Sequence, residues 1–244
     1  MSWKEIKRDP LIGELNVNRF VKDDKNGLYL QRIPKENRRI LTSIQHEYGY
    51  MGFNDAGGKF RRRKPSEQFQ LTRKAAFAGL RVLPPIDEEG DTTIYPFFTD
   101  AQTLDQYLPQ ASPEEAERIT YQIFDDLRRA HQLGIIYGDR WSHNMLVIPQ
   151  YGFINVDFDI EISGPPAKEL ELAQAAYYTL SGGREKVLSM LSQILVAKNW
   201  FNLDMMETFL QRHSVWFNET KFGGIQEETG VLIDLLNRNN RDIT

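Results

Sequence analysis

The middle of the sequence holds three side chains whose types and order suit phosphoryl transfer. Asp139 is followed five positions later by Asn144, and Asp157 stands thirteen residues after Asn144, at the end of an apolar run. One carboxylate can orient an attacking hydroxyl, while an amide oxygen and a second carboxylate are ligands that magnesium accepts on a nucleotide. The pattern predicts Asp139 as the catalytic group and Asn144 with Asp157 as metal ligands.

Two further acidic residues follow Asp157 at alternate positions. If the chain is extended there, Asp157, Asp159 and Glu161 face the same side. We predict Asp159 as an additional metal ligand and assign no such role to Glu161. Each of these residues on its own is an ordinary turn or cap residue, so the prediction depends on their combined spacing.

The elements around these residues indicate how they would be held. Ser112-Pro113-Glu114-Glu115 combines an N-cap, a proline at the first helical position and a glutamate three residues after the cap. A helix is predicted from there to Gly134, because one apolar stripe recurs at spacings of three and four: Ala116, Ile119, Ile123, Leu127 and Ala130. Strands over 145–148 and 152–156 form a predicted hairpin. Asp139 and Asn144 therefore lie between the helix and the hairpin, and Asp157 follows the hairpin directly.

The first third of the chain has the pattern of strands. A hairpin is predicted over residues 18–33, because Asn26-Gly27 favours a tight reversal. Residues 34–65 are polar and are predicted to be irregular. A helix is predicted from Ser66, as its N-cap, to about Ala78.

The remaining elements divide the chain into two parts. Strands are predicted at 81–85 and 92–98, around an acidic turn, and four or five helices from about residue 168 onward. The pattern changes from strands to helices near residues 97–101. We therefore predict two packed lobes, an N-lobe over 1–98 and a C-lobe over 99–244.

The order of helix, Tyr137-Gly138-Asp139, Asn144, hairpin and Asp157-Phe158-Asp159 resembles the protein-kinase-like superfamily. It is most similar to small, non-standard branches: the kinases of the tRNA-threonylcarbamoyl modification machinery, the lipopolysaccharide core sugar kinases and the aminoglycoside phosphotransferases. The resemblance covers roughly residues 10–185 and is strongest over 119–161. It implies an α+β, two-lobed fold, with a strand-rich N-lobe that carries one helix and a mainly helical C-lobe.

The resemblance also implies a nucleotide site with ATP and Mg²⁺ as cofactors. Asp139 would be the catalytic base or hydroxyl-orienting group, and Asn144 and Asp157 would hold the metal. Residues 95–98 would form the hinge that borders the adenine, with Tyr95, Phe97 and Phe98 lining an apolar slot.

The sequence departs from the superfamily's pattern around the catalytic residues. Tyr137 stands where these families tend to have a histidine that serves mainly as a scaffold, and Trp141 stands where serine/threonine protein kinases have a lysine. About ten residues separate Asp159 from the next predicted helix, which is short for an activation segment that docks a peptide.

The N-lobe departs further. A glycine-rich phosphate loop is absent, and Gly13 alone stands where one would begin. Leu30 occupies the position of the phosphate-binding lysine, and Arg32, on the same face of the strand, is predicted to replace it. The helix that should offer a glutamate carries Lys74, which we also predict as a phosphate-binding cation. A degraded phosphate grip, as in a pseudokinase, is the other interpretation.

These features predict a magnesium- and ATP-dependent phosphotransferase, a kinase, that acts on a hydroxyl-bearing substrate. The short segment after Asp159 favours a sugar or small molecule over a protein serine or threonine. Two alternatives stay open. One is a pseudokinase-type scaffold that binds a nucleotide without catalysis, and the other is an RNA-linked ATPase subunit.

Composition narrows the other possibilities. The 244 residues include no cysteine, which excludes disulfides and thiol chemistry, and the net charge of −4 does not by itself imply nucleic acid. A dense basic run is predicted either as a contact for a polyanion, such as RNA, a phosphosugar or an acidic lipid, or as a solvated loop. Its residues are Lys59, Arg61, Arg62, Arg63 and Lys64.

The sequence carries no sign of membrane insertion or export. The first five residues lack the apolar core of a signal peptide, and no apolar run approaches the roughly 20 residues that span a bilayer. We therefore expect a cytoplasmic protein without a transmembrane segment.

Overall fold

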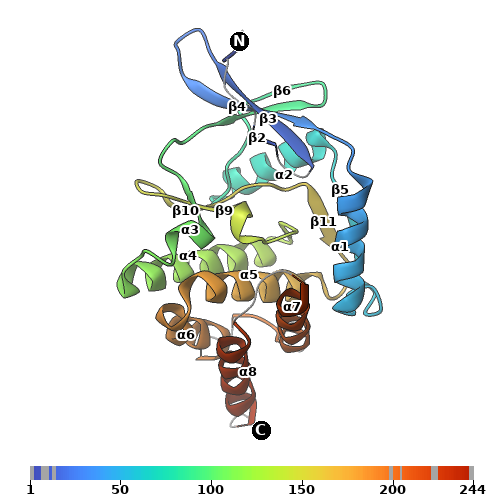
Figure 1. The fold of residues 1–244 in the computed structure, drawn as a ribbon, viewed down its shortest axis with the longest axis vertical. Helices are drawn as coiled ribbons and strands as arrows, with labels where there is room; N and C mark the ends of the chain where they lie inside the picture. The colour runs from blue at the N-terminus through green and yellow to red at the C-terminus, as the bar shows by residue number, and fades with distance from the viewer. Residues whose placement is uncertain are drawn as a thin grey trace.

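The computed structural model describes residues 3–6, 11–12, 15–197, 200–203, 205–220 and 225–241. It has a strand-rich end and a helical end (Figure 1). The strand-rich end is an antiparallel sheet in the order β1-β3-β4-β7-β6, with β2 paired to β3. Its strands are β1 (Lys4–Glu5), β2 (Leu11–Ile12), β3 (Asn16–Lys22), β4 (Leu28–Pro34), β6 (Asp87–Glu89) and β7 (Thr92–Pro96).

The hairpin predicted over residues 18–33 is confirmed as β3 and β4. Asn26 takes a left-handed conformation, with φ of 63°, at the reversal between the two strands. Asparagine tolerates that region better than most residues. Strand β4 also pairs with β7, so that Leu30 lies opposite Tyr95 and Arg32 opposite Thr93. This pairing places the predicted phosphate-binding strand beside the predicted hinge.

The helical end is built around α4 and α5. Ser112 caps α4 in the predicted capping box, and the predicted apolar stripe of this helix is buried. Helix α5 is buried on nearly all sides, which is typical of a helix at the centre of a core. The helices are α3 (Leu104–Tyr107), α4 (Pro113–Gln132), α5 (Ala167–Gly183), α6 (Glu185–Ser192), α7 (Met206–Thr220) and α8 (Gln226–Arg241).

Short strands lie between the two ends. Strands β9 (Met145–Ile148) and β10 (Gly152–Asn155) form the second predicted hairpin, and β8 (Gln102–Thr103) extends it. Strand β11 (Ile160–Ser163) pairs antiparallel with β5 (Lys59–Arg62). The segment that carries Asp157 is therefore held by a strand from the first third of the chain.

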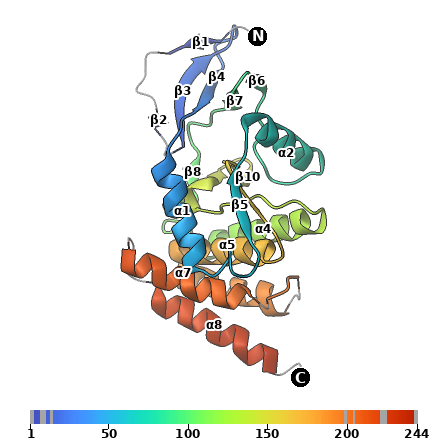
Figure 2. The ribbon, with the colours of Figure 1, turned by 90° about the vertical axis from the view of Figure 1, so that its right-hand side faces the viewer.

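Helix α1 (Arg38–Tyr50) contradicts the prediction of an irregular segment over residues 34–65. Asn37 caps the helix by accepting a hydrogen bond from the backbone nitrogen of Ile40. Ile40, Ile44 and Tyr48 recur at a spacing of four, so they share one face that packs inward. Figure 2 shows α1 running from the sheet down to α7. There Arg212 donates to the carbonyl oxygen of Met51 at 3.1 Å.

Three smaller differences concern one helix start, one predicted strand and one predicted turn. Helix α2 (Pro65–Phe77) begins with Pro65 after an N-cap at Lys64 rather than Ser66. The predicted strand at 81–85 is reduced to a single bridge between Val82 and Asn155. The acidic segment predicted as a turn includes β6.

The two predicted lobes are joined by more than the chain connection. The described residues before position 99 contain two helices, α1 and α2, rather than the one predicted. Contacts cross the predicted boundary where α1 meets α7 and where β5 pairs with β11. The fold class is nevertheless α+β, with the sheet at one end and the helical layers at the other. Within the described ranges, no helix is long and apolar enough to cross a membrane.

Candidate functional site

A cleft of about 710 Å³ lies between the sheet and the helical end. Its lining includes the four predicted catalytic and metal-binding residues, Asp139, Asn144, Asp157 and Asp159. It also includes the predicted nucleotide-binding residues Arg32, Tyr95, Phe97 and Phe98. Residues that are far apart in the sequence thus meet in one cavity, within the size range of small-molecule sites.

Lys74 is the exception among the predicted site residues. It is not part of the cleft lining, and its side chain is exposed on α2. The prediction that Lys74 reaches the nucleotide phosphates is not supported by this placement. Gly13, where a phosphate-covering loop would begin, lies outside the described residues.

Asp139 follows α4 on a loop whose backbone is anchored from α5. The backbone nitrogen of Gly138 donates to Glu171 at 2.9 Å, and the side-chain amide of Gln174 donates to the Asp139 carboxylate at 3.3 Å. Burial raises the pKa of Asp139 to about 7, and the nearby charge of Asp157 adds to the effect. A carboxylate with this pKa accepts a proton readily near neutral pH.

Asn144 ends a short 3₁₀ turn over Ser142–Asn144. Its amide nitrogen donates to the backbone oxygen of Asp139 at 2.9 Å. Because that bond uses the donor end of the amide, the oxygen end is the part of the side chain suited to a cation. His143, the neighbouring residue, is exposed.

Asp157 stands in a left-handed backbone conformation, with φ of 58°, two residues after the end of β10. Such strain in a non-glycine residue persists where the surroundings enforce it. Arg140 contributes to this restraint, since it donates to the backbone oxygen of Asp157 at 3.2 Å and to the Asn155 side chain at 2.7 Å. Its guanidinium is buried against the rings of Tyr137 and Phe158. Arg140 was not among the site residues predicted from the sequence.

Arg32 pairs with both acidic residues of the predicted metal site. Its guanidinium lies 2.7 Å from the Asp157 carboxylate and 2.9 Å from that of Asp159. Burial alone would lower the pKa of Arg32, but the charges of Asp157 and Asp159 outweigh it and raise the pKa above its usual value. Burial and the charge of Asp157 raise the pKa of Asp159. Asn16 also donates to Asp159, at 2.5 Å.

The residues present fit a magnesium ion. Their donors are hard oxygens, from Asp157, Asp159 and the amide of Asn144. The Oδ1 atom of Asp159 is buried and has no hydrogen-bond partner among the described residues, so a cation would satisfy it. In the described part of the chain, no group of three or more His, Cys, Asp or Glu residues could by itself hold a metal. Nucleotide phosphates would therefore have to supply further ligands.

One side of the cleft is an apolar slot. Aromatic contacts hold its walls, since the Phe97 ring meets Phe20 edge-on at 5.0 Å and the Phe98 ring meets Tyr151 at 5.8 Å. Aliphatic side chains from β4, from β9 and from the segments before β6 and after β10 complete it: Leu30, Leu146, Leu83 and Val156. An apolar slot bordered by backbone suits the flat base of a nucleotide.

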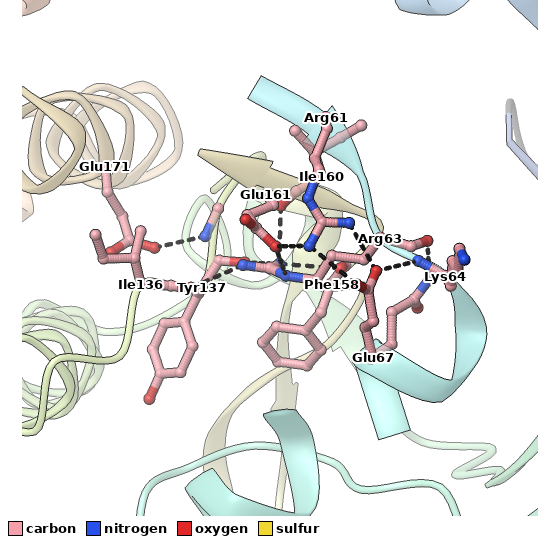
Figure 3. A network of polar contacts seen from close by, with 12 residues as sticks. Arg61, Arg63, Lys64, Glu67, Ile136, Tyr137, Phe158, Ile160, Glu161 and Glu171 are labelled. Atoms are coloured by element: carbon pink, nitrogen blue, oxygen red, sulfur yellow. Dashed lines mark hydrogen bonds and ion pairs between the residues drawn. The ribbon is translucent and has the colours of Figure 1, made fainter. Parts of the chain in front are cut away.

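The basic run of residues 59–64 forms β5 and the cap of α2, and its arginines are bonded within the protein (Figure 3). Arg61 pairs with Glu67 and Glu161, at 2.7 Å in each case. Arg62 donates to the backbone oxygens of Lys35 and Leu15. The two lysines, Lys59 and Lys64, are exposed.

Tyr137 and Trp141 are both anchored to the helical end. The Tyr137 hydroxyl donates to Asp126 on α4 at 2.7 Å. The Trp141 ring stacks on Tyr178 of α5, with ring centroids 5.5 Å apart, and also lines the cleft. Both residues depart from the kinase pattern in the sequence. In the structure they attach the loop that carries Asp139, here called the catalytic loop (residues 136–141), to the helices behind it.

Comparison with solved structures decides the fold. No family model matches the sequence, and no curated protein matches it. Two structures of the Rio2 kinase from Chaetomium thermophilum are similar, one of them a complex with ADP/Mg²⁺ and phosphoaspartate. The complex is 13% identical with a TM-score of 0.51, and the match covers 98% of this chain and 71% of that one. The other is 14% identical with a TM-score of 0.52, over 97% and 73%.

The chain has a protein-kinase-like fold. At such low identity the likeness concerns the fold alone. The choice among the three branches named above stays a prediction, as does the role of each residue in the cleft.

Proposed function

We propose that this protein is a kinase that uses ATP and magnesium to phosphorylate a hydroxyl group. The observation that carries the proposal is the meeting of Asp139, Asn144 and Asp157 in one cleft, next to an apolar slot. The Rio2 kinase complex with ADP/Mg²⁺ adds support, because a similar fold holds the same type of ligand there.

Each residue then has a distinct task. Asp139 orients the attacking hydroxyl and accepts its proton, for which a pKa of about 7 is suited. Asn144 and Asp157, with Asp159, hold the metal, and Tyr95, Phe97 and Phe98 border the base. Magnesium, when bound, would neutralise charge on the phosphates. Arg32 is placed to contact the same phosphates once its carboxylate partners are shared with a cation.

The acceptor that we propose is a sugar or another small hydroxyl compound. Strand β11 ends at Ser163 and α5 begins at Ala167. The chain therefore passes within a few residues from the proposed metal-binding segment (residues 157–160) to the core of the helical end. In a protein kinase, a longer segment at this point docks the peptide. The short connection leaves little backbone for that purpose.

Nucleotide binding and transfer can be tested separately. We expect ADP with Mg²⁺, at a hundred times its Kd, to raise the unfolding midpoint by about 5–10 °C. Asp157→Ala should lose the metal-dependent part of this shift, and Asp91→Ala, on an exposed turn, should retain it.

Asp139→Asn should bind Mg-ADP normally but lose about 10²–10⁴-fold in phosphoryl transfer, measured over a panel of sugar and peptide acceptors with labelled ATP.

One observation favours a second function, a nucleotide-binding scaffold without catalysis. Arg32 already neutralises Asp157 and Asp159, and a permanent ion pair there would leave no place for magnesium. In that case ADP would bind equally well with Mg²⁺ and with EDTA, and the kinase proposal would fail.

The RNA-linked alternative gains no such support, since Arg61, Arg62 and Arg63 are bonded internally. A polyanion contact through this run would fall to Lys59 and Lys64.

A further inference from the structure

The catalytic loop and the metal-binding segment touch through their backbones. Gly138, next to Asp139, has a φ of 106°, and a Cβ atom at this position would overlap the carbonyl oxygen of Ile160. The two segments carry the residues that must act together. Asp139 and Asn144 lie on the catalytic loop and the turn that follows it, while Asp157 lies on the metal-binding segment. Their relative position is therefore set where residues 136–138 meet residues 158–160.

Arg63 lies at this junction (Figure 3). It comes from neither segment but directly follows β5, and its backbone nitrogen extends the β5–β11 pairing by donating to the backbone oxygen of Asp159 at 2.7 Å. Its Nη2 atom donates to the backbone oxygen of Ile136 at 3.0 Å. The two hydrogens of Nη1 are shared among the backbone oxygens of Tyr137 at 2.8 Å, Phe158 at 3.0 Å and Ile160 at 2.9 Å. The guanidinium thus contacts four backbone oxygens, two from each segment.

Burial of the Arg63 guanidinium costs free energy unless its N–H groups are hydrogen-bonded. The Arg63 residue is 6% exposed, and burial lowers the pKa of its guanidinium. A buried cation is tolerated when its donors are satisfied. Here they are satisfied mainly by neutral carbonyl groups, and the charge of Glu161, 3.5 Å away, gives partial compensation. Because the guanidinium is planar and rigid, it fixes the spacing of the carbonyls that it joins.

The catalytic loop has a link of its own, from Arg140 to the backbone of Asp157. Tyr137 adds a ring contact with Phe158, with centroids 5.7 Å apart, while its hydroxyl donates to Asp126 on α4. Arg63, in contrast, joins the two segments from outside both of them. Arg63 also directly precedes Lys64, the N-cap of α2. It therefore connects the strand-rich end of the molecule to the catalytic loop.

We propose that Arg63 is a positioning residue that holds the catalytic loop and the metal-binding segment at the separation needed to share one magnesium ion. The inference rests on the proposed kinase function. It predicts that loss of the guanidinium weakens the part of nucleotide binding that depends on metal. Binding without metal uses the apolar slot and should change little, because Arg63 does not line the cleft.

The test compares Arg63→Lys, Arg63→Gln and the control Arg61→Met by calorimetric titration with ADP, in Mg²⁺ and in EDTA. Arg61 lies on β5, two residues before Arg63, but it bonds to Glu67 and Glu161 rather than to the catalytic loop. For both Arg63 variants we expect the ratio of Kd in EDTA to Kd in Mg²⁺ to fall at least about tenfold. Their Kd in EDTA should stay within about twofold of the native value, and the control should match the native protein.

Two results would overturn the proposal. One is an unchanged ratio in Arg63→Lys, which keeps the charge but not the four carbonyl bonds. The other is an equal loss of affinity with and without metal, which is the signature of general destabilisation rather than of positioning. If the native protein itself shows no metal effect, the kinase function fails, and that outcome is distinct from a failure confined to the variants.

Discussion

The acidic and the basic halves of the candidate site are assembled in different ways. Asp139, Asn144 and Asp157 lie within nineteen consecutive residues, on a loop, a turn and the end of a hairpin. The arginines that complete the site from outside this stretch, Arg32 and Arg63, come from β4 and from the end of β5. Asp139, Asn144 and Asp157 are arranged by local structure, whereas the positions of the two arginines depend on long-range strand pairing. A substitution in the strand-rich end can therefore change the catalytic centre without touching its motifs.

The two arginines also differ in what they bind. Arg32 faces the cleft and pairs with two carboxylates, so a cation or a nucleotide competes for its partners. Arg63 lies behind the cleft and binds mainly neutral carbonyls, so no ligand in the cleft competes for them. We infer that Arg32 responds to ligand binding and that Arg63 does not.

Replacing Arg32 should have the largest effect on stability. In Arg32→Met, the buried Asp159 would lose its cation and face the charge of Asp157, and removing one partner of a buried ion pair costs about 3–5 kcal/mol. We expect the free energy of unfolding in EDTA to fall by about that amount, measured by urea denaturation. Magnesium should restore part of the loss, because it would neutralise the same carboxylates.

The matched control is Arg61→Met. Arg61 also bridges two acidic side chains, but its own side chain is 49% exposed, and exposed ion pairs are worth about 0–1 kcal/mol. Equal losses in the two variants would contradict the distinction between a buried cation of the site and a surface pair. A loss in Arg32→Met that magnesium does not reduce would argue against a metal site at Asp157 and Asp159.

Gly138 tests the contact between the two catalytic segments. Gly138→Ala places a methyl group against the backbone oxygen of Ile160, and Gly134→Ala serves as control, because its φ is also positive, at 68°, but nothing lies within 4 Å. A φ of 68° lies in the left-handed region that alanine can adopt, whereas 106° lies outside it, so the difference reports the overlap together with the added backbone strain at position 138. We expect Gly138→Ala to be less stable than Gly134→Ala by about 1–3 kcal/mol. Its transfer activity should fall as well, while two variants of equal stability would show that the segments can move apart freely.

These comparisons also explain what can be predicted from the sequence. The helix from Ser112 to Gly134, the hairpin after Asn144 and the acids beside them carry local signals, namely caps, spacing and turns, and the structure confirms the elements. Arg32 was predicted from the alternation of one strand. The ion pairs of Arg32 with two acidic residues more than a hundred positions away could not be predicted, because they depend on the order of the strands in the sheet.

Two other features show why the remainder was missed. Arg63 belongs to a basic run whose composition suggests a solvated surface, and composition does not tell which side chain turns inward. Helix α1 did have a signal, because Asn37 is a cap residue and Ile40, Ile44 and Tyr48 follow at a spacing of four. Polar neighbours obscured that stripe, and the helix became evident through its packing against α7.

The smallest effect, and the one that bears most directly on Asp139, is the dependence on pH. Its pKa is raised from 3.8 to about 7, so below pH 7 the free protein holds a proton where a base is needed. We expect kcat/KM for transfer to fall about tenfold per unit below that pH and to level off above it. The same shift predicts stability that is present below pH 3.8 and lost as pH rises through about 7. Asp139→Asn should therefore be more stable than the native protein at about pH 8 and equal to it near pH 4. A rate profile that stays flat down to about pH 5 would assign proton transfer to another group.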